Sequence, residues 1–265
     1  MVPRILSIAG SDSSGGAGIQ ADAKAITLLG GHAMTAITAV TAQNTLGVTR
    51  IDTLPAASVA AQIGACIEDI GVDAVKTGMF ATADQVDAAG DVLVNADVPI
   101  VVDPVMIATS GAALAGNDVV DALRRRLFPR AALVTPNLDE LGVLTETSIT
   151  SLDDMIARAA AFAADRQVPV LAKGGHLAAG DMITDALCLP GADPRLYRHA
   201  RVSTSETHGT GCTLASAIAT ALGAGAPLTA AVESARDYVR AALMTAPGLG
   251  ARSGPLGSGR PLSPG

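Results

Sequence analysis

Residues 205–213 combine two glycines and a cysteine immediately before a helical pattern. Apolar residues recur at three- and four-residue spacing over residues 214–222, which predicts a helix. The backbone N–H groups of Gly209 and Gly211 would then point out of a helix start, where the helix dipole favours an anion. We expect Cys212, at this position, to have its thiol pKa lowered from about 8.5 toward neutrality. A tight turn leading into an Ala-rich core helix, with an inert cysteine, is the alternative.

The elements that position this turn follow an alternating pattern. Short apolar runs predict buried strands over residues 4–10, 35–42, 73–77, 98–102, 131–135 and 168–172, with helical patterns between most of them. This alternation indicates an α/β fold with a mostly parallel central sheet and helices on both faces. Residues 182–189 and 196–202 are expected to pair as strands, and Pro136 to start a helix. The Gly/Pro/Ser-rich residues from 247 onward predict a loop or a disordered end.

Polar and glycine residues follow these strands at equivalent places. Gly10, Gln43, Met79, Asp103 and Lys173 each come at the carboxyl end of a predicted strand, and Asn137 and Glu140 follow another. Parallel strands end at one edge of a sheet, so we expect these side chains to line one cleft. Two carboxylates, one ammonium and an anion site without a Walker motif describe a phosphoryl-transfer site that uses magnesium.

Composition narrows the class of protein. The chain has 265 residues, 49% of them hydrophobic, and a net charge of −7, which suits one large α/β domain and argues against nucleic acid as the main partner. The three cysteines form no CxxC pair, so we expect a reducing, cytoplasmic location without a disulfide framework or a zinc site. The uncharged stretches 25–49 and 210–232 are interrupted by Gly, Pro and polar residues, so no membrane segment is predicted.

Seven motifs together resemble the ribokinase superfamily and, within it, the hydroxymethylpyrimidine/phosphomethylpyrimidine kinases of thiamine biosynthesis. They occur in the family's order and cover nearly all of the chain except the tail. The motifs are GSDSSGGAGIQAD (10–22), TAQNTLGV (41–48), KTGMF (76–80), DPVM (103–106), TPNLDE (135–140), KGGH (173–176) and THGTGCT (207–213).

The resemblance implies a ribokinase-like single domain over residues 1–247, without a large lid, followed by a tail at 248–265. It implies ATP and Mg²⁺ as cofactors, a small-molecule pyrimidine as substrate, and a homodimer. Cys212 is similar to the cysteine that replaces the superfamily's usual Asp base. Lys173 resembles the lysine that meets the nucleotide phosphates. The resemblance also implies that backbone donors for the transferring phosphoryl group come from Gly209, Thr210 and Gly211. It implies that magnesium is held by Asp103 and Glu140, and that Asn137 supports the magnesium site.

For the acceptor pocket the resemblance points to Gly10, Asp22, Gln43, Met79 and Val105. Gln43 also has a physical rationale, because a carboxamide offers a donor and an acceptor side by side, as an aminopyrimidine edge requires. Structural roles remain open at this stage: helix capping for Glu140, a backbone contact for Gln43, a surface salt bridge for Lys173 and core packing for Met79 and Val105.

Three other functions compete with a pyrimidine kinase. A pyridoxal kinase would share the Gly-Thr-Gly-Cys turn and the mechanism. A non-catalytic pyrimidine-binding module is disfavoured because Asp103, Glu140, Lys173 and Cys212 are all present. A cysteine hydrolase would need a histidine beside Cys212, and both His176 and His208 lie in motifs that phosphate binding explains better.

Overall fold

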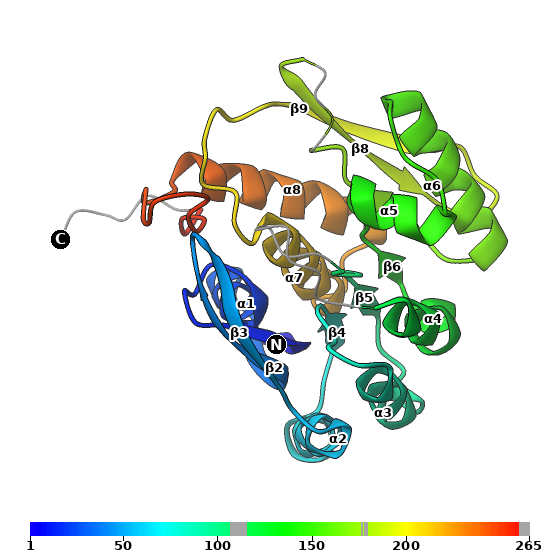
Figure 1. Cartoon of the computed structure of the whole chain (residues 1–265). Helices are drawn as coiled ribbons and strands as arrows, with labels where there is room; N and C mark the ends of the chain where they lie inside the picture. The colour runs from blue at the N-terminus through cyan, green and yellow to red at the C-terminus, as the bar shows by residue number, and fades with distance from the viewer. Residues whose placement is uncertain (107–115, 176, 178–179, 260–265) are drawn as a thin grey trace.

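The computed structural model describes residues 1–106, 116–175, 177 and 180–259. Its centre is a nine-stranded sheet in the order β3-β2-β1-β4-β5-β6-β7-β8-β9, in which β1, β2, β4, β5, β6 and β7 are parallel (Figure 1). The strands are β1 Arg4–Asp12, β2 His32–Asn44, β3 Gly47–Thr53, β4 Ala74–Thr77, β5 Ile100–Val102, β6 Leu133–Val134, β7 Val170–Ala172, β8 Met182–Cys188 and β9 Arg195–Ala200.

Helices cover both faces of the sheet (Figure 1). One face packs against α2 Ala56–Ala65, α3 Ala83–Leu93, α4 Asn117–Arg126, α5 Leu138–Thr145 and α6 Leu152–Arg166. The other packs against α1 Gly18–Leu28, α7 Thr210–Gly223 and α8 Leu228–Met244. Two short turns of helix, η1 Cys66–Ile70 and η2 Phe128–Arg130, lie in the connections. Successive strand residues alternate between the two cores, as the period of two requires: Ile5 faces α7 and Leu6 the opposite layer.

The predicted α/β architecture is confirmed, and three local predictions are corrected. Residues 47–53 form an edge strand, β3, that was not predicted. Pairing of Gln43 with Val48 extends β2 to Asn44, so Gln43 lies within the strand rather than beyond it. Pro136 does not start α5: the helix begins at Leu138, because Asn137 caps it with its side chain. The predicted pair at the far edge is confirmed as antiparallel β8 and β9.

The chain after residue 247 is a loop, as expected, but it is tied to the body. The N–H of Gly257 donates to Ala242 O at 3.0 Å, and His208 N–H donates to Gly254 O at 3.1 Å. Residues 260–265 lie outside the described residues. Within the described part of the chain, no helix is long and apolar enough to cross a membrane.

Candidate active site

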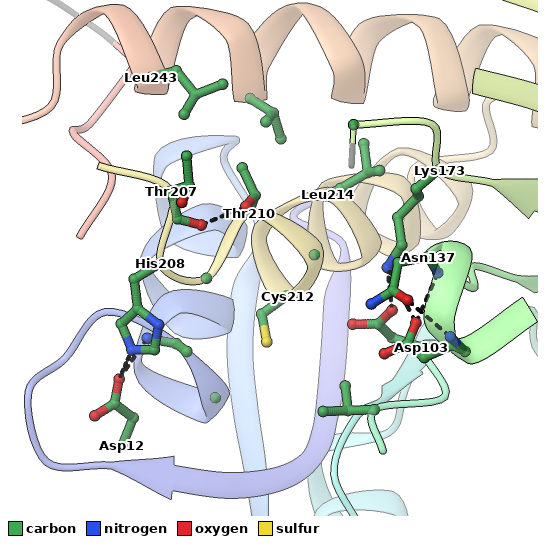
Figure 2. Close-up of a pocket in the computed structure, with 18 of the residues that line it drawn as sticks. Asp12, Asp103, Asn137, Lys173, Thr207, His208, Thr210, Cys212, Leu214 and Leu243 are labelled. Carbon is green, nitrogen blue, oxygen red and sulfur yellow. Dashed lines mark hydrogen bonds and ion pairs between the residues drawn. The ribbon is translucent and has the colours of Figure 1, made fainter. Parts of the chain in front are cut away.

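A cavity of about 770 Å³ opens at the carboxyl edge of the parallel strands, beside the start of α7 (Figure 2). It brings together all but one of the predicted site residues, although they come from strand ends spread over the whole chain. Those lining it are Gly10, Gln43, Met79, Val105, Asp103, Asn137, Glu140, Lys173, Gly209, Thr210, Gly211 and Cys212. The predicted convergence on one edge is therefore what the fold produces.

The turn before α7 requires glycine at its first position. Gly209 has φ +82°, and a Cβ there would lie 1.9 Å from Gly16 O, so a larger residue would collide with the loop after β1. Among the residues that the structure describes, no side chain caps this helix start, which leaves its first-turn N–H groups directed at the cavity. The Thr210 N–H is an exception, because it donates to Thr207 O at 3.3 Å. The anion site therefore begins at Gly211 rather than at Thr210.

Cys212 lines the cavity and is partly exposed. Figure 2 shows its sulfur between the His208–Asp12 pair and the group around Lys173. The expectation of a lowered pKa is wrong for the free protein: burial raises the pKa of the thiol to about 11, although the Lys76 cation and the Gly18 N–H oppose that rise. Loss of hydration is the largest influence on this thiol and exceeds the stabilisation of the thiolate by Lys76 and the Gly18 N–H.

A lysine and two carboxylates face Gly211 across the cavity. Lys173 Nζ lies 2.8 Å from Asp103 Oδ1 and 3.9 Å from Glu140 Oε2. Asp103 also accepts a hydrogen bond of 2.9 Å from Thr135 Oγ1. A Cβ on Gly211 would be 3.2 Å from Lys173 Nζ, so the absent side chain at this glycine keeps the ammonium close to the helix start. A phosphate bound there would meet both a cation and backbone donors.

Glu140 serves as a helix cap and as a cavity carboxylate at once. Its Oε2 accepts from the Asn137 N–H at 2.8 Å, and Asn137 Oδ1 accepts from the Glu140 N–H at 2.9 Å, which is a complete capping box. This confirms the capping alternative and also fixes the carboxylate beside Lys173. Burial raises the pKa of Glu140 to about 7, with Lys173 opposing the shift and Asp103 adding to it.

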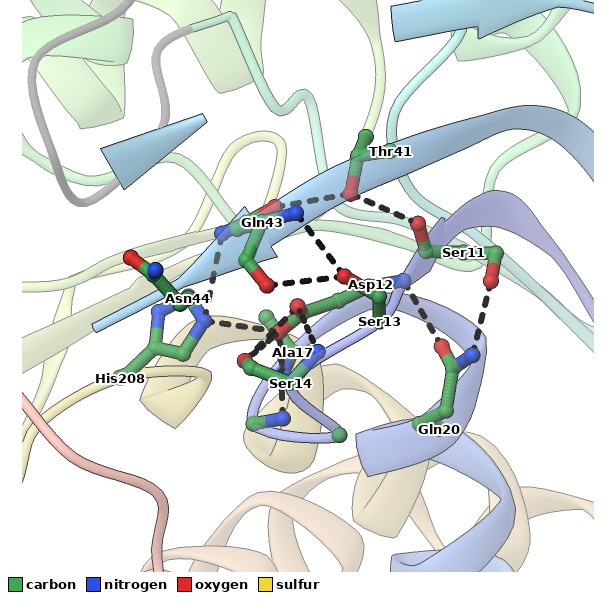
Figure 3. Close-up of polar contacts among 12 residues, drawn as sticks. Ser11, Asp12, Ser13, Ser14, Ala17, Gln20, Thr41, Gln43, Asn44 and His208 are labelled. Atoms are coloured by element: carbon green, nitrogen blue, oxygen red, sulfur yellow. Dashed lines mark hydrogen bonds and ion pairs between the residues drawn. The ribbon is translucent and has the colours of Figure 1, made fainter. Parts of the chain in front are cut away.

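Gln43 lies on the opposite side of the cavity in a polar network that joins two glycine-rich turns (Figure 3). Its Oε1 lies 3.1 Å from Thr41 Oγ1, and its Nε2 lies 3.3 Å from His208 Nε2. The same His208 nitrogen is 2.8 Å from Asp12 Oδ2. His208 therefore links Gln43 of β2 to Asp12 in the loop after β1.

Asp12 is the anchor of the loop after β1. Its carboxylate accepts from the N–H groups of Ser14, Gly16 and Ala17 at 2.9, 3.1 and 2.8 Å. Burial raises the pKa of Asp12, but the hydrogen bonds from His208, Ser14 and Ala17 outweigh burial and lower the pKa to about 2. A buried carboxylate with this many donors makes the loop a fixed wall of the cavity.

Asp22 does not occupy the predicted place in the acceptor pocket. It is fully buried, does not line the cavity, and pairs with Lys76 at 2.8 Å. Position within the motif at 10–22 suggested a ligand contact, but Asp22 lies on the face of α1 that packs against β1 and α7. Its partner Lys76 is equally buried and, like Asp22, does not line the cavity.

The sequence reading also missed the part of the cavity made by β8, β9 and α8. Ile183, Val239 and Leu243 give it an apolar wall, and Leu243 points down from α8 toward Thr210 in Figure 2. Val239 and Leu243 are four residues apart on α8, a spacing that shows one helical face but not what that face covers. His176, considered for a cysteine hydrolase, lies outside the described residues.

Comparison with known proteins identifies the family. The family model for phosphomethylpyrimidine kinase matches residues 12–257. The chain belongs to this family. It is 44% identical over 259 residues to hydroxymethylpyrimidine/phosphomethylpyrimidine kinase of Streptomyces coelicolor, covering 97% of this chain and 94% of that protein. The Mycobacterium tuberculosis protein of the same name is 45% identical over 256 residues, covering 96% and 93%. The chain is accordingly a kinase.

Two kinds of vitamin kinase among the solved structures have the same fold as this chain. Pyridoxal kinase from Staphylococcus aureus in complex with ADP superposes with a TM-score of 0.89 at 32% identity, covering 98% of this chain and 94% of that one. Phosphomethylpyrimidine kinase from Clostridium difficile superposes with a TM-score of 0.78 at 37% identity, covering 90% and 98%. The ribokinase-like fold predicted from the motifs is confirmed by these neighbours.

Proposed function

We propose that this kinase transfers the γ-phosphoryl group of ATP to the hydroxymethyl group of 4-amino-5-hydroxymethyl-2-methylpyrimidine, and then phosphorylates the monophosphate to the diphosphate. The names of the Streptomyces coelicolor and Mycobacterium tuberculosis relatives support this substrate. The observation that carries the mechanism is the position of Cys212, on the cavity wall between the Lys173 end and the Gln43 end. A base placed there would reach an acceptor hydroxyl while the nucleotide phosphates lie against α7.

The reaction follows from that placement. The γ-phosphate lies against the N–H groups at the start of α7, with Lys173 beside it. The hydroxyl oxygen forms the new P–O bond while the bond from γ-phosphorus to the bridging oxygen breaks, and ADP leaves. Cys212 as thiolate takes the hydroxyl proton. Phosphoryl transfer depends chiefly on positioning and charge stabilisation, so a base whose thiolate is a minor species in the free protein is sufficient.

Asp103 and Glu140 are the residues that would hold Mg²⁺. Both are nearly fully buried yet line the cavity, and oxygen ligands are what this ion prefers. The described residues contain no group of three or more His, Cys, Asp or Glu side chains that could hold a metal. Two carboxylates match Mg²⁺ that keeps waters and shares the nucleotide phosphates rather than a closed protein cage. The ion would neutralise charge on the β- and γ-phosphates.

The acceptor ring would lie between Met79 and Val105, with its amino edge on Gln43. Gly10 leaves space for the Met79 side chain, because a Cβ at position 10 would lie 3.3 Å from Met79 Sδ. The Gln43 carboxamide reaches the cavity while His208 and Thr41 hold its two ends. A fixed amide offers a donor and an acceptor in a set orientation, which is the requirement for reading an aminopyrimidine edge.

Pyridoxal kinase is the second candidate, since the S. aureus enzyme superposes at a TM-score of 0.89. A side-by-side assay with ATP and Mg²⁺ separates the two, and mass spectrometry of the products counts the phosphates added. We expect a higher kcat/KM for the pyrimidine and both mono- and diphosphate products. A higher kcat/KM for pyridoxal would reverse the assignment. The homodimer and the cytoplasmic location stay predictions, and sedimentation of the purified chain tests the first.

A further inference from the structure

A lysine–aspartate pair is sealed beneath the site, between β4 and α1. Lys76 Nζ lies 2.8 Å from Asp22 Oδ2 and 3.0 Å from Asp22 Oδ1, and both side chains have 0% of their surface exposed. A completely buried ion pair gains little net stability over an apolar pair of the same size, because both charges lose their hydration. Stability alone therefore does not account for two charges at this place, and a role in the site is the physical alternative.

The pair is attached directly to the helix that carries Cys212. Ser216 Oγ donates to Asp22 Oδ1 at 2.8 Å, and Ser216 is one helical turn after Cys212 on the same face of α7. From the sheet, Ser7 Oγ donates to Asp22 Oδ2 at 2.6 Å. Strand β1 and helix α7 thus each donate a hydroxyl hydrogen bond to Asp22 of α1, and Asp22 in turn fixes the Lys76 ammonium of β4.

The end of β4 leaves room for that ammonium. A Cβ on Gly78 would lie only 2.8 Å from Lys76 Nζ, so the glycine is what lets the lysine fold back under the cavity. The neighbouring residue Met79 lines the cavity itself. The cation consequently occupies the layer immediately below the acceptor wall and the start of α7.

Four groups set the charge around the Cys212 sulfur. Lys76 from β4 and the Gly18 N–H at the start of α1 favour the thiolate, whereas Asp22 from α1 and Asp103 after β5 disfavour it. Of the influences that oppose burial, the Lys76 cation is the strongest. The carboxylates of Asp22 and Asp103, with the thiolate of Cys212, in turn raise the pKa of Lys76 despite its burial. The lysine therefore stays charged, and Cys212 is one of the groups that its charge acts on.

We propose that Lys76, held in place by Asp22, is a positioning residue that stabilises the thiolate of Cys212 from beneath α7. It does not touch substrate; it acts through the sulfur. The inference rests on the proposed function only for the catalytic use of the thiolate, since the ionisation of Cys212 can be followed in the free protein.

The test is the pH dependence of Cys212 alkylation by iodoacetamide in the full chain without nucleotide or metal, followed for each cysteine by peptide mass spectrometry. Only the thiolate reacts, so a rise of one pKa unit lowers the rate below the pKa about tenfold. For Lys76→Met we expect a fall of about tenfold or more at pH 8 and a midpoint at higher pH. The double variant Asp22→Asn/Lys76→Met leaves no unpaired buried charge and should fold; it should show a smaller shift of the same sign.

Ser216→Ala is the matched control. It removes the hydrogen bond that Ser216, one helical turn after Cys212, donates to Asp22, and it changes no charge. Its alkylation rate should stay within about twofold of wild type. Wild-type alkylation in both lysine variants would overturn the proposal, and so would an equal fall in Ser216→Ala. If wild type phosphorylates no pyrimidine but the alkylation shift is present, the proposed function fails while this inference stands.

Discussion

Two lysine–aspartate pairs lie near the first turns of α7, one beside Gly211 and one bonded to Ser216, and they differ mainly in what surrounds them. In both pairs the closest Nζ–Oδ distance is 2.8 Å. Lys76 and Asp22 are 0% exposed, whereas Lys173 keeps 14% of its side chain exposed and lines the cavity with Asp103. Lys76 and Asp22, the sealed pair, are thus enclosed in the interior, whereas Lys173 and Asp103, the open pair, line the cavity.

The difference in exposure decides what each pair can do. Lys173 can exchange part of its contact with Asp103 for a phosphate, and Asp103 can exchange part of its contact with Lys173 for a hydrated cation, because the cavity admits both. Lys76 and Asp22 have no access to a ligand, so their charges act only through the field that they impose on neighbouring groups. We therefore expect substitutions at the sealed pair to affect stability most, and substitutions at the open pair to affect turnover most.

The largest expected effect is the loss of stability in Lys76→Met. Removing one partner of a buried pair leaves the other charge uncompensated, so the free energy of unfolding should fall by about 3–5 kcal/mol. Urea denaturation measures this, and Asp22→Asn/Lys76→Met should recover much of the loss. Wild-type stability in the single variant would mean that the pair is not sealed as described.

Lys173→Met breaks the open pair, and we expect it to affect turnover more than stability. Loss of a donor aimed at the transferring phosphoryl group should lower kcat by about 10²–10³-fold. The free energy of unfolding should fall by less than in Lys76→Met, because water can reach Asp103 from the cavity. Steady-state kinetics and urea denaturation on the same two variants give the comparison directly; a larger stability loss in Lys173→Met would contradict it.

Asp12 is a further buried carboxylate, and its partner is His208 rather than a lysine. Its pKa is about 2 in the folded chain, below the ordinary value of 3.8, so its stabilising contribution is complete above pH 4 and is lost as pH falls toward 2. The shift corresponds to about 2 kcal/mol. Asp12→Asn should have lower stability than wild type at pH 6 and a flatter dependence of stability between pH 4 and 2; parallel pH profiles would disprove this assignment.

The smallest expected effect concerns the loop that carries Lys173. Arg236 Nε donates to Asp185 Oδ2 at 2.7 Å, and Asp185 Oδ1 accepts from the Gly174 N–H at 2.9 Å, next to Lys173. Arg236→Met should loosen this loop and raise KM for ATP about tenfold, with KM for the pyrimidine unchanged.

Arg195→Met is the control for this variant, since Arg195 also lies over the Tyr197 ring but pairs with the exposed Glu233. Its KM values should equal those of wild type. Equal effects in the two arginine variants would assign the change to packing on Tyr197 rather than to the loop.

The cleft could be predicted from the sequence because most of the residues that line it follow predicted strands. The carboxyl ends of parallel strands lie at one edge of the sheet whatever the detailed packing. Met79, Asp103 and Lys173 could be placed in that way. Lys76 could not, because a lysine in the middle of an apolar strand is explained only by a partner, Asp22, that is distant along the chain. The direction of the Cys212 pKa was missed for a related reason: a helix start is visible in sequence, whereas loss of hydration depends on the assembled cavity.

The central claim is that Cys212 is the base for the acceptor hydroxyl, and single-turnover kinetics of Cys212→Ala test it most directly. Loss of a base should lower the rate of phosphoryl transfer by about 10²–10⁴-fold, while the Kd of the pyrimidine stays within about twofold. Cys66→Ala, which changes a cysteine outside the cavity lining, should react like wild type. A Cys212→Ala variant with a near-wild-type transfer rate would contradict the account.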